Sequence, residues 1–91
     1  MSDAKKALQL IQTGITNVQT RIKMVGRKRS LSFEDQQIAH DQDRTNLLNF
    51  PLRSFRGTPD YSSIHRAYFE WDKLIDNERI ILDEAFGRDE E

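Results

Sequence analysis

The sequence predicts an all-α fold, either a three-helix bundle or a long antiparallel helical hairpin with a shorter crossing helix. Apolar residues recur at intervals of three and four in two long segments, and start and stop signals divide the chain into three. No run has the alternation or the β-branched density that a strand needs. A chain of 91 residues forms at most one domain. We therefore expect a single helical domain over residues 1–87 and a frayed acidic tail over residues 88–91.

The first predicted helix covers residues 3–25, and Ser2 or Asp3 can cap its first turn. Gly14 flanks its apolar stripe and would let a neighbouring helix approach closely, and Gly26 is suited to end the helix. The stripe is narrow and has the spacing of a heptad seam, which packs against another long helix. Its members are Leu8, Ile11, Ile15, Val18, Ile22 and Val25.

The second predicted helix covers residues 33–49, with Ser32 as its N-cap. Pro51 ends it, because the residue before a proline is pushed away from helical geometry. This segment has no single apolar stripe. One side carries Ile38 and Leu48, and roughly the opposite side carries Phe33, His40 and Leu47.

The third predicted helix opens with the sequence Thr58-Pro59-Asp60 and ends near Phe86. Thr58 is a capping residue, Pro59 suits the first helical position, and Asp60 places a negative charge at the positive end of the helix. A broad apolar stripe follows, and Glu78 falls in its middle, where we consider a break or bend. We expect the first and third helices to form an antiparallel spine and the second to pack across them.

Composition narrows the class of protein. The chain has no cysteine, which excludes disulfides, thiolate metal sites and cysteine nucleophiles. A secreted domain of this size usually needs disulfides, so we expect a cytoplasmic location. No apolar run approaches the length that spans a bilayer, so we expect no membrane partner.

Charge is distributed unevenly along the chain. Residues 1–30 carry seven Lys or Arg and one acidic residue, whereas residues 61–91 carry four and nine. Either a basic helix packs beside an acidic one, or the two ends offer oppositely charged patches to a partner.

Two apolar side chains of the third segment fall outside its stripe. At 100° per residue, Phe69 and Ile80 point almost opposite to Trp71, toward a face that also holds charged residues. They are either scattered surface residues or part of an interface with a second copy or another protein. The predicted partner-binding residues are Phe69, Asp72, Lys73, Asp76 and Ile80.

The densest basic cluster spans the end of the first predicted helix and the residues that follow it. It consists of Arg21, Lys23, Arg27, Lys28 and Arg29. Such a patch can contact phosphates by charge alone, although no aromatic residue within it could stack on bases. The simpler interpretation is a solvated helix end and turn.

Candidate catalytic and metal-binding residues are sparse. His40 and Asp43 lie three residues apart and could share a helical face, but no further ligand is placed beside them. The glycines are isolated, so no phosphate-binding loop is present, and no serine has the local pattern of an activated nucleophile. We therefore expect no catalytic residues, no metal, no cofactor and no small-molecule substrate.

These features favour a non-enzymatic protein–protein interaction module, a small regulator or inhibitor that binds a protein partner through helix faces. Chains of this class include accessory proteins of phages and other mobile elements. The partner is either another protein or a second copy in a homo-oligomer. The alternative function is a nucleic-acid-binding accessory protein that uses the basic cluster at residues 21–29.

Overall fold

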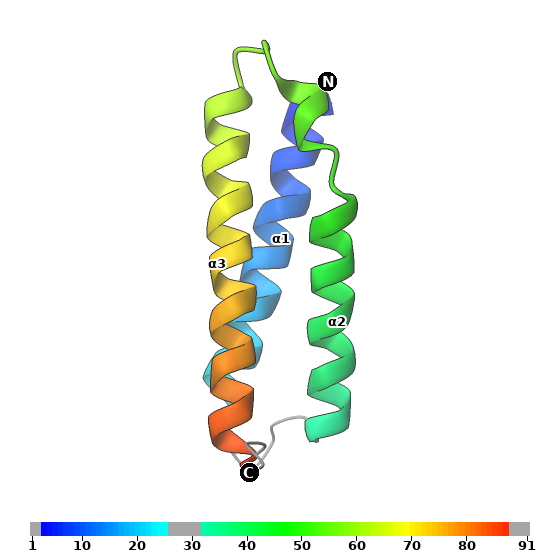
Figure 1. The fold of residues 1–91 in the computed structure, drawn as a ribbon. Helices are drawn as coiled ribbons and strands as arrows, with labels where there is room; N and C mark the ends of the chain where they lie inside the picture. The colour runs from blue at the N-terminus through cyan, green and yellow to red at the C-terminus, as the bar shows by residue number, and fades with distance from the viewer. Residues whose placement is uncertain (1–2, 26–31, 88–91) are drawn as a thin grey trace.

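The computed structural model describes residues 3–25 and 32–87, which form a three-helix bundle (Figure 1). The helices are α1 (Asp3–Met24), α2 (Phe33–Asn49) and α3 (Tyr61–Ala85), and a short 3₁₀ helix, η1 (Leu52–Phe55), follows α2. The all-α prediction is confirmed, and of its two versions the bundle is the correct one. The bundle is elongated, with extents of 46 × 27 × 16 Å.

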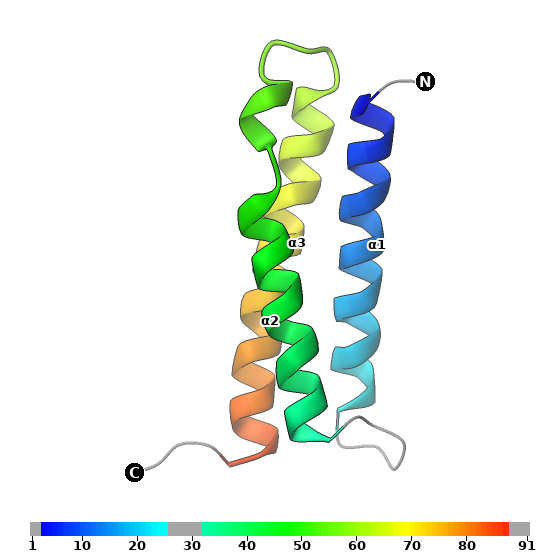
Figure 2. The same ribbon diagram turned by 90° about the vertical axis from the view of Figure 1, so that its right-hand side faces the viewer.

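The predicted arrangement of the helices needs correction. Helices α1 and α3 run in the same direction, and α2 runs opposite to both (Figure 1). Consistent with this, one surface hollow is lined by Lys5 at the start of α1 and Asp60 just before α3. The chain reverses direction twice, so its first and third helices must be parallel. Helix α2 lies lengthwise beside the other two and does not cross them (Figure 2).

The start of α2 matches the prediction because local capping chemistry determines it. The Ser32 hydroxyl oxygen accepts a hydrogen bond from the Asp35 backbone N–H at 3.2 Å. At the other end, Phe50 adopts an extended conformation before Pro51.

The predicted first residue of the third helix, Pro59, lies two residues before the observed start of α3 at Tyr61. Thr58 does not cap the helix: its hydroxyl donates to the Phe55 carbonyl oxygen at 2.7 Å. The Thr58 carbonyl oxygen accepts from the Tyr61 N–H at 3.2 Å, which closes a turn before the helix begins. From Tyr61 onward α3 is unbroken through Glu78, so the bend considered there does not occur. Gly87 follows the helix with a φ of +58°, a value that favours glycine.

The core runs along the bundle axis and is led by Trp71 of α3, whose side chain is 1% exposed. A Cβ atom built on Gly14 would lie only 2.6 Å from the Trp71 ring, so glycine is what lets the indole pack against α1. The close approach predicted at Gly14 is therefore present. Within the described residues, no helix is both long and apolar enough to cross a membrane.

Candidate functional site

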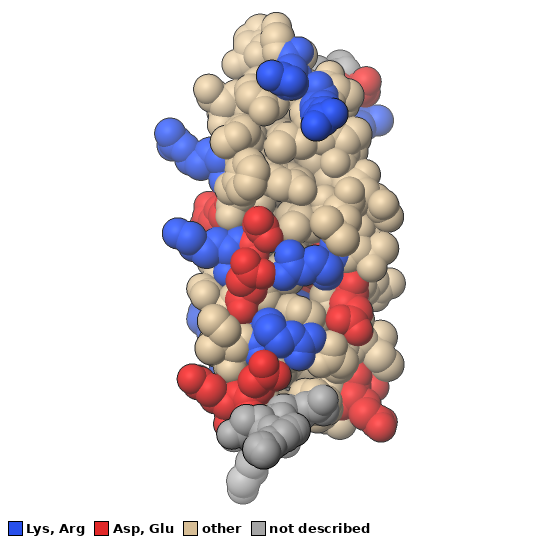
Figure 3. All heavy atoms as spheres, viewed as in Figure 1, with Lys and Arg blue, Asp and Glu red and all other residues tan. Residues whose placement is uncertain are grey.

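The surface over the seam between α2 and α3, here called the α2–α3 face, carries a ladder of opposite charges (Figure 3). Arg44 of α2 donates to Asp72 at 3.2 Å and also to Asp76, both on α3. The hydrogen bond to Asp76 raises the pKa of Arg44 by more than burial lowers it.

At the next step of the ladder the positive side chain comes from α3 and its partners come from α2. There Arg79 of α3 donates to the Gln37 amide oxygen of α2 at 3.0 Å, and it lies 4.0 Å from the Asp41 carboxylate. The positive charge therefore comes from α2 at one height and from α3 at the next.

An apolar groove lies beyond one end of this ladder, where α2 leads into η1. We call it the Leu48–Phe69 groove. Leu48 is 70% exposed and Phe69 is 46% exposed, so large apolar side chains face solvent here. The groove is lined by Arg44, Leu47, Leu48, Phe50, Pro51, Leu52, Arg53, Tyr68, Phe69 and Asp72.

Ring contacts hold Phe69 in position. The Phe69 ring centroid lies 4.7 Å from that of His65 and 5.1 Å from that of Tyr68. Tyr68 is itself anchored, because its hydroxyl donates to the Leu47 carbonyl oxygen at 3.2 Å. Burial raises the pKa of Tyr68, so this donor stays protonated. The groove is thus a surface formed before any partner arrives, which lowers the entropy cost of binding.

The predicted partner-binding residues fall into separate groups. Phe69 and Ile80 are both exposed, as predicted, and Lys73 is exposed between them. Eleven residues of helix separate Phe69 from Ile80, which is about 16 Å along the axis. Asp72 and Asp76 are engaged by Arg44, so they belong to the ladder.

The sequence reasoning missed Leu48 and Leu52 as neighbours of Phe69. A signal was present for Leu48, since it lies away from His40 and Leu47 on α2. Its pairing with Phe69 follows only once α2 and α3 are known to be antiparallel neighbours.

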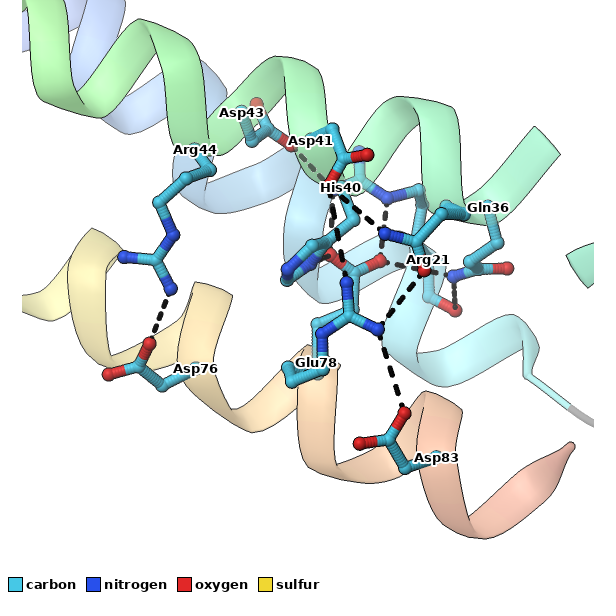
Figure 4. A network of polar contacts seen from close by, with 11 residues as sticks. Arg21, Gln36, His40, Asp41, Asp43, Arg44, Asp76, Glu78 and Asp83 are labelled. Atoms are coloured by element: carbon cyan, nitrogen blue, oxygen red, sulfur yellow. Dashed lines mark hydrogen bonds and ion pairs between the residues drawn. The ribbon is translucent and has the colours of Figure 1, made fainter. Parts of the chain in front are cut away.

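A cluster of buried polar side chains, here called the buried polar cluster, joins all three helices (Figure 4). It consists of Arg21, Gln36, His40, Asp43 and Glu78. Glu78 is at its centre and is 0% exposed. The Glu78 carboxylate accepts from Arg21 Nε at 2.8 Å, from Arg21 Nη2 at 2.9 Å and from Gln36 Nε2 at 3.1 Å.

Two further contacts complete the buried polar cluster. Nδ1 of His40 lies 2.9 Å from the Glu78 carboxylate and acts as a donor, because an ionised carboxylate can only accept. Arg21 also donates to Asp43. Each charged member thus has a charged or hydrogen-bonding partner.

These contacts set the ionisation of Glu78. Burial alone raises its pKa, but the hydrogen bonds from His40, Arg21 and Gln36 lower it by more, to about 2. Burial likewise lowers the pKa of Arg21, yet its bonds to Glu78 and Asp43 leave that pKa raised. Both groups therefore stay charged at neutral pH.

The buried polar cluster changes the interpretation of the predicted basic patch. Arg21 is a core ion-pair partner, with a side chain 13% exposed, so it does not belong to a surface patch. Lys23 is exposed. Arg27, Lys28 and Arg29 lie outside the described residues.

His40 and Asp43 do share a helical face, but that face is buried. His40 contacts Glu78 and Asp43 contacts Arg21, which occupies both side chains with partners inside the bundle. In residues 3–25 and 32–87, no group of three or more His, Asp or Glu side chains is arranged to hold a metal ion.

No protein-family model matches this sequence. Comparisons with curated proteins and with solved structures likewise gave no match.

Proposed function

We propose that this chain is a non-enzymatic protein-interaction module that binds a protein partner through the α2–α3 face. The observation that carries the proposal is the Leu48–Phe69 groove. Its two most exposed large apolar side chains are Leu48 and Phe69, which line the same groove from two different helices. Burial of exposed apolar area against a partner is the main source of binding free energy at protein interfaces.

The composition of the α2–α3 face supports the same proposal. An aromatic and aliphatic centre beside charged side chains is the usual anatomy of a protein interface. On the α2–α3 face, Arg44 and Arg79 are engaged by Asp72, Asp76 and Asp41, so these two arginines are not free to bind phosphate. By binding, the chain would cover a surface of its partner, which suits a small regulator or inhibitor.

Affinity capture from the source cells tests this proposal. Tagged chain carrying both Leu48→Ala and Phe69→Ala is compared with the unchanged chain, after nuclease treatment of the lysate. The matched control is Leu10→Ala, because Leu10 is 57% exposed but lies on α1, in the groove between α1 and α2. Circular dichroism checks that each variant keeps its helix content.

The expected result is a protein recovered in a stoichiometric amount by the unchanged chain and the Leu10→Ala control, and lost with the double variant. The recovered partner can be another protein or an untagged copy of the chain. Capture that disappears on nuclease treatment, or that survives the double variant, would contradict the proposal.

A further inference from the structure

We infer that the partner on the α2–α3 face is a second copy of this chain, related by a two-fold axis that runs along the bundle between the two faces. The inference depends on the proposed function, since it names the occupant of that same surface. Its basis is that the face is complementary to itself in both charge and apolar surface.

The symmetry operation determines which residues meet. A two-fold axis along the bundle keeps the height of every residue and exchanges the two sides of the face. Helix α2 of each copy therefore lies over α3 of the other, and these two helices run antiparallel, as α2 and α3 do within one chain (Figure 1). Any pair that meets across the seam within a chain also meets between chains.

The charge ladder is complementary under this operation. Arg44 pairs with Asp72 and Asp76 across the seam, so Arg44 of one copy lies over those two carboxylates of the second. One step along, Asp41 lies near Arg79 across the same seam, so Asp41 of one copy lies over Arg79 of the second. Opposite charges meet at both heights, which favours this alignment over shifted ones.

The apolar surface matches in the same alignment. Leu48 and Phe69 line one groove, and their sequence neighbours Leu47 and Tyr68 are hydrogen-bonded across the seam. Leu48 and Phe69 therefore lie at a similar height, so Leu48 of each copy packs on Phe69 of the other. The two grooves then cover each other. A two-fold axis perpendicular to the bundle and level with Arg44 would instead place the groove over the step where Asp41 and Arg79 lie, and would bury charge against apolar surface.

The absence of cysteine allows a direct geometric test. Leu48→Cys and Phe69→Cys are made as separate single-cysteine chains of different mass, mixed in equal amounts and oxidised. Intact-mass spectrometry then measures the disulfide-linked mixed dimer. The control mixtures pair Leu48→Cys with Ile80→Cys, which lies at a different height, and with Leu10→Cys, which lies on another surface.

Sedimentation velocity supplies a second measurement on the unmodified chain over a concentration series. We expect a monomer–dimer equilibrium whose dissociation constant rises roughly tenfold or more with Phe69→Ala. Arg44→Glu should weaken the dimer, and adding Asp76→Arg should restore it, because the double exchange recovers opposite charges within and between copies.

Together the two measurements show whether the chain forms the proposed dimer. A dimer linked preferentially between positions 48 and 69 supports the inference. A chain that stays monomeric throughout, or a dimer linked equally well in the control mixtures, overturns it. The proposed function would survive that result if the capture experiment still recovers a different protein that depends on Leu48 and Phe69.

Discussion

Trp71 and Glu78 both lie on the buried side of α3, seven residues or about two turns apart, yet they are surrounded by different chemistry. Around Trp71 the core is apolar: the indole packs against Gly14 and belongs to a cluster of buried apolar side chains. Around Glu78 the core is a set of hydrogen-bonded charges. We refer to these regions as the Trp71 half and the Glu78 half.

The difference shows two ways of joining the same three helices. Apolar packing in the Trp71 half stabilises the bundle in proportion to buried area but specifies alignment weakly. In the Glu78 half, burial of charge costs desolvation energy, and the attraction between partners roughly offsets that cost. We propose that its benefit is specificity, since Glu78 of α3 has partners on both α1 and α2 at defined distances.

Removal of the central carboxylate should disrupt the Glu78 half most. Glu78→Ala leaves the positive charge of Arg21 buried with only Asp43 as a charged partner and His40 without its acceptor. We expect the free energy of unfolding to fall by about 3–5 kcal/mol. Urea denaturation measures it, with Glu84→Ala, an exposed site on the same helix, as the control. A loss equal to that of the control would mean that the bonds of Glu78 contribute nothing to stability.

The Glu78 half should also be sensitive to acid. The pKa of Glu78 is lowered from 4.5 to about 2 in the folded chain, so between these values the unfolded chain binds more protons than the folded one. The stability that Glu78 contributes is fully present above pH 4.5 and is lost as the pH falls toward 2.

The unfolding free energies of the unchanged chain and Glu78→Gln, measured over this pH range, isolate that contribution. The advantage of the unchanged chain should shrink as the pH decreases. An advantage that is constant with pH would contradict the lowered pKa.

The Trp71 half should respond to added volume. In Gly14→Ala, the new methyl group would lie 2.6–2.8 Å from three atoms of the Trp71 ring, so the indole or the helix must shift. Overpacking of this kind costs about 1–3 kcal/mol, which outweighs the gain in helix propensity. Thermal unfolding measures the loss in stability, and Thr13→Ala, at the exposed neighbouring position, is the control. In a Trp71→Leu background, Gly14→Ala should no longer lower the stability of the chain. If it lowers the stability there by the same amount, the loss comes from a contact other than the one with Trp71.

The two halves also differ in how far the sequence could predict them. The apolar stripes of α1 and α3 and the flanking Gly14 were enough to predict close helix packing. Glu78 could be located on the buried side of its helix. Its role could not be predicted, because its partners Arg21 and His40 come from other helices. Helix periodicity assigns each residue to a face and does not say which faces meet.

The same limit explains the errors at the surface. Phe69 was predicted to be exposed from its phase on α3, and it is. Its neighbour Leu48 was not identified, because that pairing depends on the direction of α2 relative to α3. The predicted direction of α3 was wrong for the same reason. At Thr58, a local capping pattern was outweighed by the turn that connects η1 to α3.

The smallest predicted effect is at the end of the Glu78 half, where α2 begins. Ser32→Ala removes the acceptor for the Asp35 N–H. Because Gln36, one turn further, belongs to the buried polar cluster, fraying there would also loosen its bond to Glu78. We expect a loss of about 1 kcal/mol in unfolding free energy and faster amide exchange in the first turn of α2. The matched control is Ser63→Ala, an exposed serine within α3, where alanine should slightly stabilise the helix. Equal effects of the two substitutions would show that the Ser32 hydroxyl has no capping role, and that packing around Glu78 is enough to hold the start of α2.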